Sequence, residues 1–180
     1  YPQGRRMTGR LFLVGGPSGA GKDTLLAGAL AADPRLHWAR RVITRPESAG
    51  GEPFEGVDQA EFDRRWAQGE FALHWQAHGL RYGVPKAQLT ALGEGRDVLV
   101  NGSRGAMAQA WAAYPDLRVI VITAPAEVLA DRLAARGREG RADILARLSR
   151  AELALPEGLP VIEIVNDDTP AAGVARLLQA

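Results

Sequence analysis

The chain has 180 residues, with 22 Lys and Arg, 21 Asp and Glu, and no cysteine. This length fits a single domain that can bury a sufficient core without a structural metal or a disulfide. The lack of cysteine excludes a disulfide scaffold, a thiol nucleophile and a thiolate zinc site. The apolar and charged fractions, 46% and 24%, exclude a disordered or collagen-like chain.

Charge and hydropathy argue against nucleic-acid and membrane partners and favour small-molecule ligands. The net charge is +1, whereas nucleic-acid-binding domains usually carry a large basic excess. No apolar run approaches the roughly 20 residues of a membrane span, and no signal peptide is visible. We therefore expect a cytoplasmic protein whose translation starts at Met7, with the first six residues a non-native remnant. The oligomeric state does not follow from the sequence.

Apolar runs alternate with stretches of helical periodicity, which indicates an α/β domain with a largely parallel sheet. The expected strands cover residues 11–14, 41–43, 98–100, 119–122 and 161–165, with a small antiparallel pair at 71–75 and 82–84. The expected helices cover residues 22–32, 58–68, 85–92, 105–113, 126–136, 142–155 and 170–179. Asp58 is the expected N-cap of the second helix.

The clearest chemical motif follows the first expected strand. It consists of Gly16, Pro17, Ser18, Gly19, Ala20, Gly21 and Lys22. Glycines between a buried strand and a helix allow the backbone N–H groups to surround phosphate oxygens, and the helix adds the positive end of its dipole. Lys22 is one of only two lysines beside 20 arginines, and it is expected to reach the β- and γ-phosphates. The motif predicts a P-loop core over residues 11–32.

The residue after Lys22 departs from the usual P-loop pattern. Most P-loops carry there a Ser or Thr whose hydroxyl binds Mg²⁺, whereas this chain has Asp23 followed by Thr24. The Asp23 carboxylate could bind Mg²⁺, directly or through water, or it could only complement the helix dipole. Both interpretations stay open, and Thr24 is expected on the α-phosphate side.

Beyond the P-loop, the chain resembles the guanylate kinase group of P-loop kinases from Arg10 onward. The matching pieces are residues 16–22, Thr44-Arg45 with Gly51-Glu52, 69–71, Tyr82-Gly83, 129–139, Arg147-Leu148 and 165–168. The resemblance implies a single P-loop NTPase domain with a parallel sheet flanked by helices. It also implies a substrate-binding insertion near residues 39–92 and a helical lid near residues 130–142.

The residues that read guanine in that group are missing here. Leu73 and Ser103 align with the two acidic residues that accept hydrogen bonds from guanine, and Val84 aligns with a serine. A second arginine of the guanylate kinase phosphate site aligns with Ser48. A site without these carboxylates cannot prefer guanine.

The residues in their place resemble the ribose 1,5-bisphosphate phosphokinase family. The resemblance lies in residues 43–50, in residues 74–80, and in Asn101-Gly102-Ser103-Arg104 together with Gly21-Lys22-Asp23. It implies ATP-dependent phosphorylation of the 1-phosphate of ribose 1,5-bisphosphate, with ATP and Mg²⁺ as cofactors. The alternatives are a nucleoside monophosphate or other small-metabolite kinase, and a non-catalytic interaction module of the guanylate kinase type.

The resemblance also implies the roles of individual residues. Lys22, Arg132, Arg136 and Arg147 would act on the transferred phosphoryl group, the last three from the lid and the helix after it. ATP would contact residues 16–24 and Asn166, the latter beside the adenine, and Asp23 would be the Mg²⁺ ligand. The acceptor would contact Arg45, Tyr82, Asn101, Ser103 and Arg104, with Asn101 and Ser103 on its hydroxyl groups. The nucleophile is an already anionic phosphate oxygen, so no general base is expected.

Overall fold

A parallel sheet of five strands forms the centre of the computed structural model, which describes residues 9–16, 20–46, 54–77, 79–134, 161–166 and 170–179. The strands, in spatial order, are β2 (His37–Trp38), β7 (Val98–Asn101), β1 (Leu11–Gly15), β8 (Arg118–Thr123) and β9 (Val161–Val165). Every neighbouring pair is parallel. The structure therefore confirms the α/β class predicted from the alternating pattern.

Strand β1 lies between two apolar layers, because its side chains point alternately to opposite faces. Phe12 and Val14 face a core formed with helices α1 (Lys22–Ala32) and α6 (Pro170–Gln179). Leu11 and Leu13 face the other core, which includes helix α3 (Arg104–Ala113). Parallel sheets covered on both faces have continuous apolar strands, and all five residues of β1 are buried.

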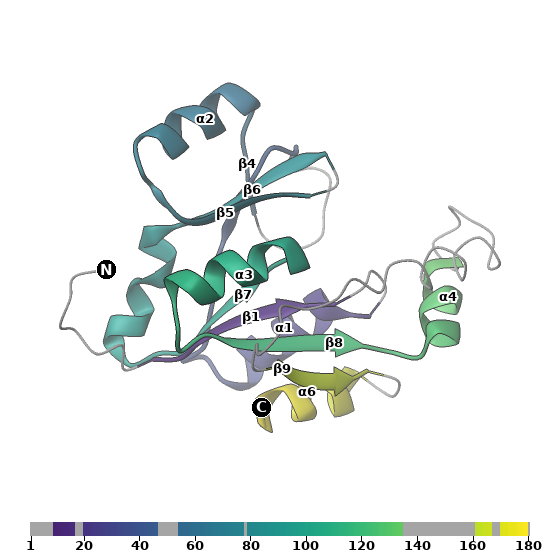
Figure 1. Ribbon diagram of the computed structural model, residues 1–180. Helices are drawn as coiled ribbons and strands as arrows, with labels where there is room; N and C mark the ends of the chain where they lie inside the picture. The colour runs from purple at the N-terminus through teal and green to yellow at the C-terminus, as the bar shows by residue number, and fades with distance from the viewer. Residues whose placement is uncertain are drawn as a thin grey trace.

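A second, mixed sheet of four strands lies on the α3 side of the central sheet (Figure 1). Its spatial order is β4 (Phe54–Gly56), β3 (Arg41–Ile43), β6 (Leu80–Pro85) and β5 (Phe71–Ala77). Strand β3 is parallel to β4 and antiparallel to β6, and β5 is antiparallel to β6. Leu73, Trp75, Tyr82 and Val84 belong to the same core as α3, so this inner face packs toward the central sheet.

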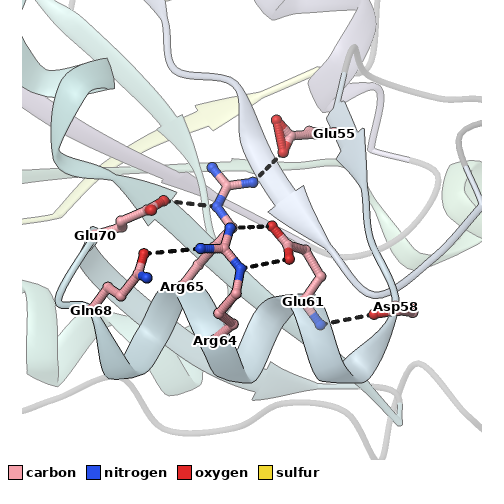
Figure 2. Close-up of polar contacts among 7 residues, drawn as sticks. All are labelled: Glu55, Asp58, Glu61, Arg64, Arg65, Gln68 and Glu70. Atoms are coloured by element: carbon pink, nitrogen blue, oxygen red, sulfur yellow. Dashed lines mark hydrogen bonds and ion pairs between the residues drawn. The ribbon is translucent and has the colours of Figure 1, made fainter.

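Helix α2 (Gln59–Ala67) covers the outer face of the second sheet. Phe62 packs on Phe71 with ring centroids 4.8 Å apart. Figure 2 shows that Arg65 of α2 forms ion pairs with Glu55 on β4 and with Glu70 just before β5. These contacts fix the helix across the sheet.

The predicted N-cap of α2 is confirmed. The Asp58 side chain accepts a hydrogen bond from the Glu61 backbone N–H at 2.8 Å (Figure 2). This bond satisfies one of the backbone donors that the first helical turn leaves without an intrahelical partner.

Most other expected elements also occur in the structure. The antiparallel pair is present and longer than expected, and residues Lys86–Glu94 form a 3₁₀ helix, η2. Helix α4 (Ala126–Ala134) is described up to Ala134, and the expected helix at 142–155 lies outside the described residues. The short strands β2 and β4 were not predicted. No helix in the described part of the chain is long and apolar enough to cross a membrane.

Candidate active site

The carboxyl ends of the parallel strands meet at one edge of the central sheet. Gly16 follows β1, Asn101 ends β7, and Asn166 follows β9. Strand β1 lies between β7 and β8, so the strands that follow it in the chain are placed on both of its sides. In open α/β sheets, ligands bind at the carboxyl edge beside such a switch point. The sheet topology therefore places the glycine-rich loop where a ligand is expected.

Two glycines of the loop are required by the backbone. Gly16 has φ 144°, and a Cβ atom there would lie 2.0 Å from the Ile122 carbonyl oxygen. Gly21, the N-cap of α1, has φ 87°, and a Cβ atom there would lie 2.6 Å from Nδ2 of Asn166. Both positions therefore need a residue without a side chain.

Lys22 extends back over the glycine-rich loop. Its Nζ donates a hydrogen bond to the Gly16 carbonyl oxygen at 2.9 Å. Burial lowers the pKa of Lys22, and the nearby positive charge of Arg41 lowers it further, while Asp23 raises it. An anion bound beside this ammonium group would offset both the desolvation and the repulsion.

Asp23 and Asn101 join the loop helix to the end of β7. Nδ2 of Asn101 donates a hydrogen bond to Oδ1 of Asp23 at 3.2 Å. Asp23 and Thr24 are both exposed at the start of α1, whereas Asn101 is buried. No group of three or more His, Cys, Asp or Glu residues that could hold a metal occurs in the described part of the chain. Mg²⁺ in phosphoryl-transfer sites is usually bound by one or two carboxylates together with substrate phosphates, and Asp23 fits this donor set.

Asn166 and Arg132 hold the other side of the loop. Nδ2 of Asn166 donates to the Ala20 carbonyl oxygen at 2.7 Å. Arg132 on α4 donates to the Asn166 carbonyl oxygen at 2.7 Å and to that of Ala20 at 3.5 Å. Arg132, expected at the transferred phosphoryl group, therefore contacts the backbone of the loop in this structure.

The second sheet contributes arginine and aromatic side chains. The Tyr82 and Trp75 rings are stacked, with centroids 5.5 Å apart. The Arg45 guanidinium carbon lies 4.5 Å from the centre of the Phe54 ring. The Arg41 guanidinium carbon lies 4.9 Å from the centre of the Tyr82 ring. Burial lowers the pKa of Arg41 to about 10; Tyr82 and Asp23 raise it, and Arg45 lowers it.

Arg41 is a candidate site residue that was not predicted from the sequence. It is adjacent to Arg40, and no motif distinguishes the two. Only the sheet register separates them: Arg40 donates to the Phe54 carbonyl oxygen, whereas Arg41 contacts the aromatic pair on the inner face.

The remaining predicted residues are described in part. Ser103 is the N-cap of α3, and its buried Oγ has no hydrogen-bond partner among the described residues. Arg104 is the first residue of α3, and its side chain is not described. Pro17, Ser18, Gly19, Arg136 and Arg147 lie outside the described residues.

Similarity to known structures concerns the fold. A guanylate kinase from Anaplasma phagocytophilum superposes with a TM-score of 0.71 at 21% identity, covering 97% of this chain and 85% of that one. A sugar kinase from Janibacter superposes with a TM-score of 0.53 at 19% identity. At this identity the comparison shows the P-loop kinase fold, with its parallel sheet and flanking helices.

Several curated proteins share a much higher sequence identity with the chain than these solved structures do. The chain is 52% identical over 170 residues to the ribose 1,5-bisphosphate phosphokinase PhnN of Ruegeria sp. TM1040, covering 89% of that protein. It is 47% identical to the protein of that name from Brucella abortus, covering 90% of it. It is also 49% identical to a bifunctional ribose 1,5-bisphosphokinase-thymidine phosphorylase of Cupriavidus necator, but spans only 29% of that protein.

These relatives establish the family, although no family model matches the chain. Two of them are matched along nearly their whole length, and these matches cover 93% and 94% of this chain. The chain therefore belongs to the ribose 1,5-bisphosphate phosphokinase PhnN family.

Proposed function

We propose that the chain transfers the γ-phosphoryl group of ATP to the 1-phosphate of ribose 1,5-bisphosphate. An oxygen of the 1-phosphate forms a bond to the γ-phosphorus, and the bond from that phosphorus to the β–γ bridging oxygen breaks. The electron pair of that bond leaves with ADP, and the second product is 5-phosphoribosyl 1-pyrophosphate. The observation that carries the proposal is the identity of about half of all aligned residues with proteins of this name.

The arrangement of charge supports a phosphoryl transfer without a general base. The attacking phosphate oxygen is already anionic at neutral pH, so the protein needs to align two anions and offset their repulsion. Lys22 and Arg41 lie within electrostatic reach of one another at the P-loop, and Arg45 lies within reach of Arg41. These cations can bring donor and acceptor phosphates together.

Asp23 is the residue that would hold the magnesium ion of MgATP. Its carboxylate offers the hard oxygen ligand that Mg²⁺ requires. When bound, Mg²⁺ would neutralise charge on the β- and γ-phosphate oxygens. The buried amide of Asn101 orients the Asp23 carboxylate.

The lack of base-reading polar groups at Leu73 and Val84 supports a sugar phosphate rather than guanine as acceptor. Leu73 and Val84 stand at the positions expected to read a base, and both are fully buried in the core. Neither offers a hydrogen-bond acceptor to a base. Arg41 and Arg45 lie beside the Tyr82 and Phe54 rings of this face, and guanidinium groups bind phosphate.

The product identifies the reaction. Wild-type protein with MgATP and ribose 1,5-bisphosphate should give a ³¹P NMR spectrum with the coupled doublets of a sugar pyrophosphate, together with the retained 5-phosphate signal. Release of inorganic phosphate without these doublets would contradict the proposal. The predicted cytoplasmic location and the lid at residues 130–142 stay predictions.

A further inference from the structure

Two arginines lie within electrostatic reach of each other at the inner face of the second sheet: Arg41 on β3 and Arg45 two residues after that strand. Arg41 is paired with Phe54 in the register of β3 and β4. The Arg45 guanidinium carbon lies 4.5 Å from the centre of the ring of that same Phe54. Arg45 therefore folds back toward Arg41, and the Nε atoms of both side chains are shielded from solvent.

The stacked aromatic rings of Trp75 and Tyr82 lie beside Arg41. Its guanidinium carbon lies 4.9 Å from the centre of the Tyr82 ring and 5.9 Å from that of Trp75. Cation–π contacts offset only part of the cost of removing a guanidinium group from water. A cation in this position disfavours the empty folded protein, and an anionic ligand would reverse that effect.

Arg41 lies within electrostatic reach of two other cations. Burial lowers its pKa most, Tyr82 and Asp23 raise it, and the charge of Arg45 lowers it; the charge of Arg41 in turn lowers the pKa of Lys22. Asp23 is the carboxylate that acts on both Lys22 and Arg41. Phosphate groups bound beside Lys22, Arg41 and Arg45 would offset the repulsion between these cations.

We propose that Arg41 and Arg45 divide the acceptor between them, each holding a different one of its two phosphate groups. This inference rests on the proposed function and extends it to residues that determine specificity. A planar guanidinium group can grip one phosphate through two parallel N–H···O bonds. A pentose carrying phosphates on C1 and C5 presents two such groups, and Arg41 and Arg45, which both neighbour Phe54, supply one guanidinium group for each.

Binding of the two sugar monophosphates distinguishes the role of Arg41 from that of Arg45. Titration calorimetry would measure ribose 1-phosphate and ribose 5-phosphate on wild-type protein, Arg41→Met and Arg45→Met, with Mg²⁺ and a non-hydrolysable ATP analogue present. Each substitution should weaken the binding of one monophosphate by about 10- to 100-fold, the usual loss for a charge-assisted hydrogen-bonded contact. The affinity for the other monophosphate should stay within about threefold of wild type. The two variants should show opposite preferences.

Two further variants serve as controls. Arg81→Met removes a guanidinium group from the same sheet that contacts Phe62 and Trp66 and pairs with Asp63 of α2, so neither monophosphate should change. Arg41→Lys keeps the charge but loses the planar fork, so its affinity should lie between those of wild type and Arg41→Met. Thermal melts show that each variant is folded before titration.

Three results would overturn the inference. Both variants could lose affinity for the same monophosphate, either variant could lose affinity for both monophosphates equally, or neither variant could lose affinity for any monophosphate. Wild-type protein that turns over ribose 1,5-bisphosphate but shows one of these patterns refutes the division of phosphates alone. Wild-type protein that neither binds a sugar monophosphate nor turns over the bisphosphate refutes the proposed function itself.

Discussion

Nδ2 of Asn101 donates a hydrogen bond to Oδ1 of Asp23 at 3.2 Å, which joins the end of β7 to the first turn of α1. Asn101 is buried and Asp23 is exposed, so the rigid residue orients the accessible carboxylate. A carboxylate held in one orientation can bind a cation with less loss of side-chain freedom.

Asn101→Ala should therefore change the magnesium dependence of the reaction. We expect the Mg²⁺ concentration for half-maximal rate to rise about 10-fold, the lower end of the usual effect of losing a residue that orients a metal ligand. The measurement is the rate at saturating ATP and acceptor as Mg²⁺ is varied. A higher KM for the sugar with an unchanged Mg²⁺ dependence would instead support the sugar contact predicted from the sequence.

Lys22→Ala should lower kcat by at least about 10²- to 10³-fold, because it removes a cation from the charge that develops during transfer. Burial and the charge of Arg41 lower the pKa of Lys22, so the empty folded state gains little from this ammonium group. The melting temperature should accordingly stay within about 4 °C of wild type. Lys86→Ala is the matched control, because Lys86 is the other lysine of the chain and is exposed in η2. If Lys86→Ala lowered kcat as much as Lys22→Ala, this role for Lys22 would be contradicted.

Gly21→Ala should weaken ATP binding as well as the fold. Gly21 has φ 87°, and the new Cβ would displace the Asn166 amide that bonds the Ala20 carbonyl. Gly69 also has positive φ, at 71°, but has nothing within 4 Å of the added carbon. Gly69→Ala should thus cost only the backbone strain of about 1 kcal/mol, measured by urea unfolding, with ATP affinity unchanged. Equal effects of the two substitutions on ATP affinity would show that the Asn166 contact is unimportant.

Arg41→Met should stabilise the empty protein at neutral pH. The folded protein holds the Arg41 proton less tightly than the unfolded chain, because burial lowers the pKa to about 10. The charged Arg41 therefore lowers the free energy of unfolding; this effect is fully present below about pH 10 and decreases as the pH rises through that value. At pH 7.5 we expect a gain of about 1–3 kcal/mol, smaller than the shift alone implies because the ring contacts are lost.

Urea unfolding of wild type and Arg41→Met at pH 7.5 and above pH 10 tests this sign. The difference in the free energy of unfolding between wild type and Arg41→Met should be smaller at the higher pH. A variant less stable than wild type at pH 7.5 would mean that Arg41 stabilises the empty fold, which would contradict this prediction.

Much of the fold could be predicted from the sequence because its strongest signals are local. The buried strand β1, the glycine turn and the helix that follows lie next to each other on the chain, and Asp58 caps a helix whose Phe62 lies one turn further. Strands β2 and β4 were missed because two or three residues, one of them glycine in β4, give no readable alternation. They exist through pairing with β7 and β3.

The candidate site was harder to predict because its contacts join distant segments. Arg41 looks equivalent to Arg40 in the sequence, and only the register of β3 with β4 and β6 separates them. The hydrogen bond between Asp23 and Asn101 spans 78 positions. The roles given to all the site residues stay predictions, and residues 17–19, Arg136 and Arg147 also lie outside the described residues.

ADP release from MgATP, with ribose 1,5-bisphosphate and GMP as acceptors in parallel wells, tests the proposed function most directly. The absence of a guanine-reading carboxylate at Leu73 and Ser103 and the arginines on the inner face predict turnover with the sugar bisphosphate alone. Turnover with GMP and none with the sugar bisphosphate would contradict the account.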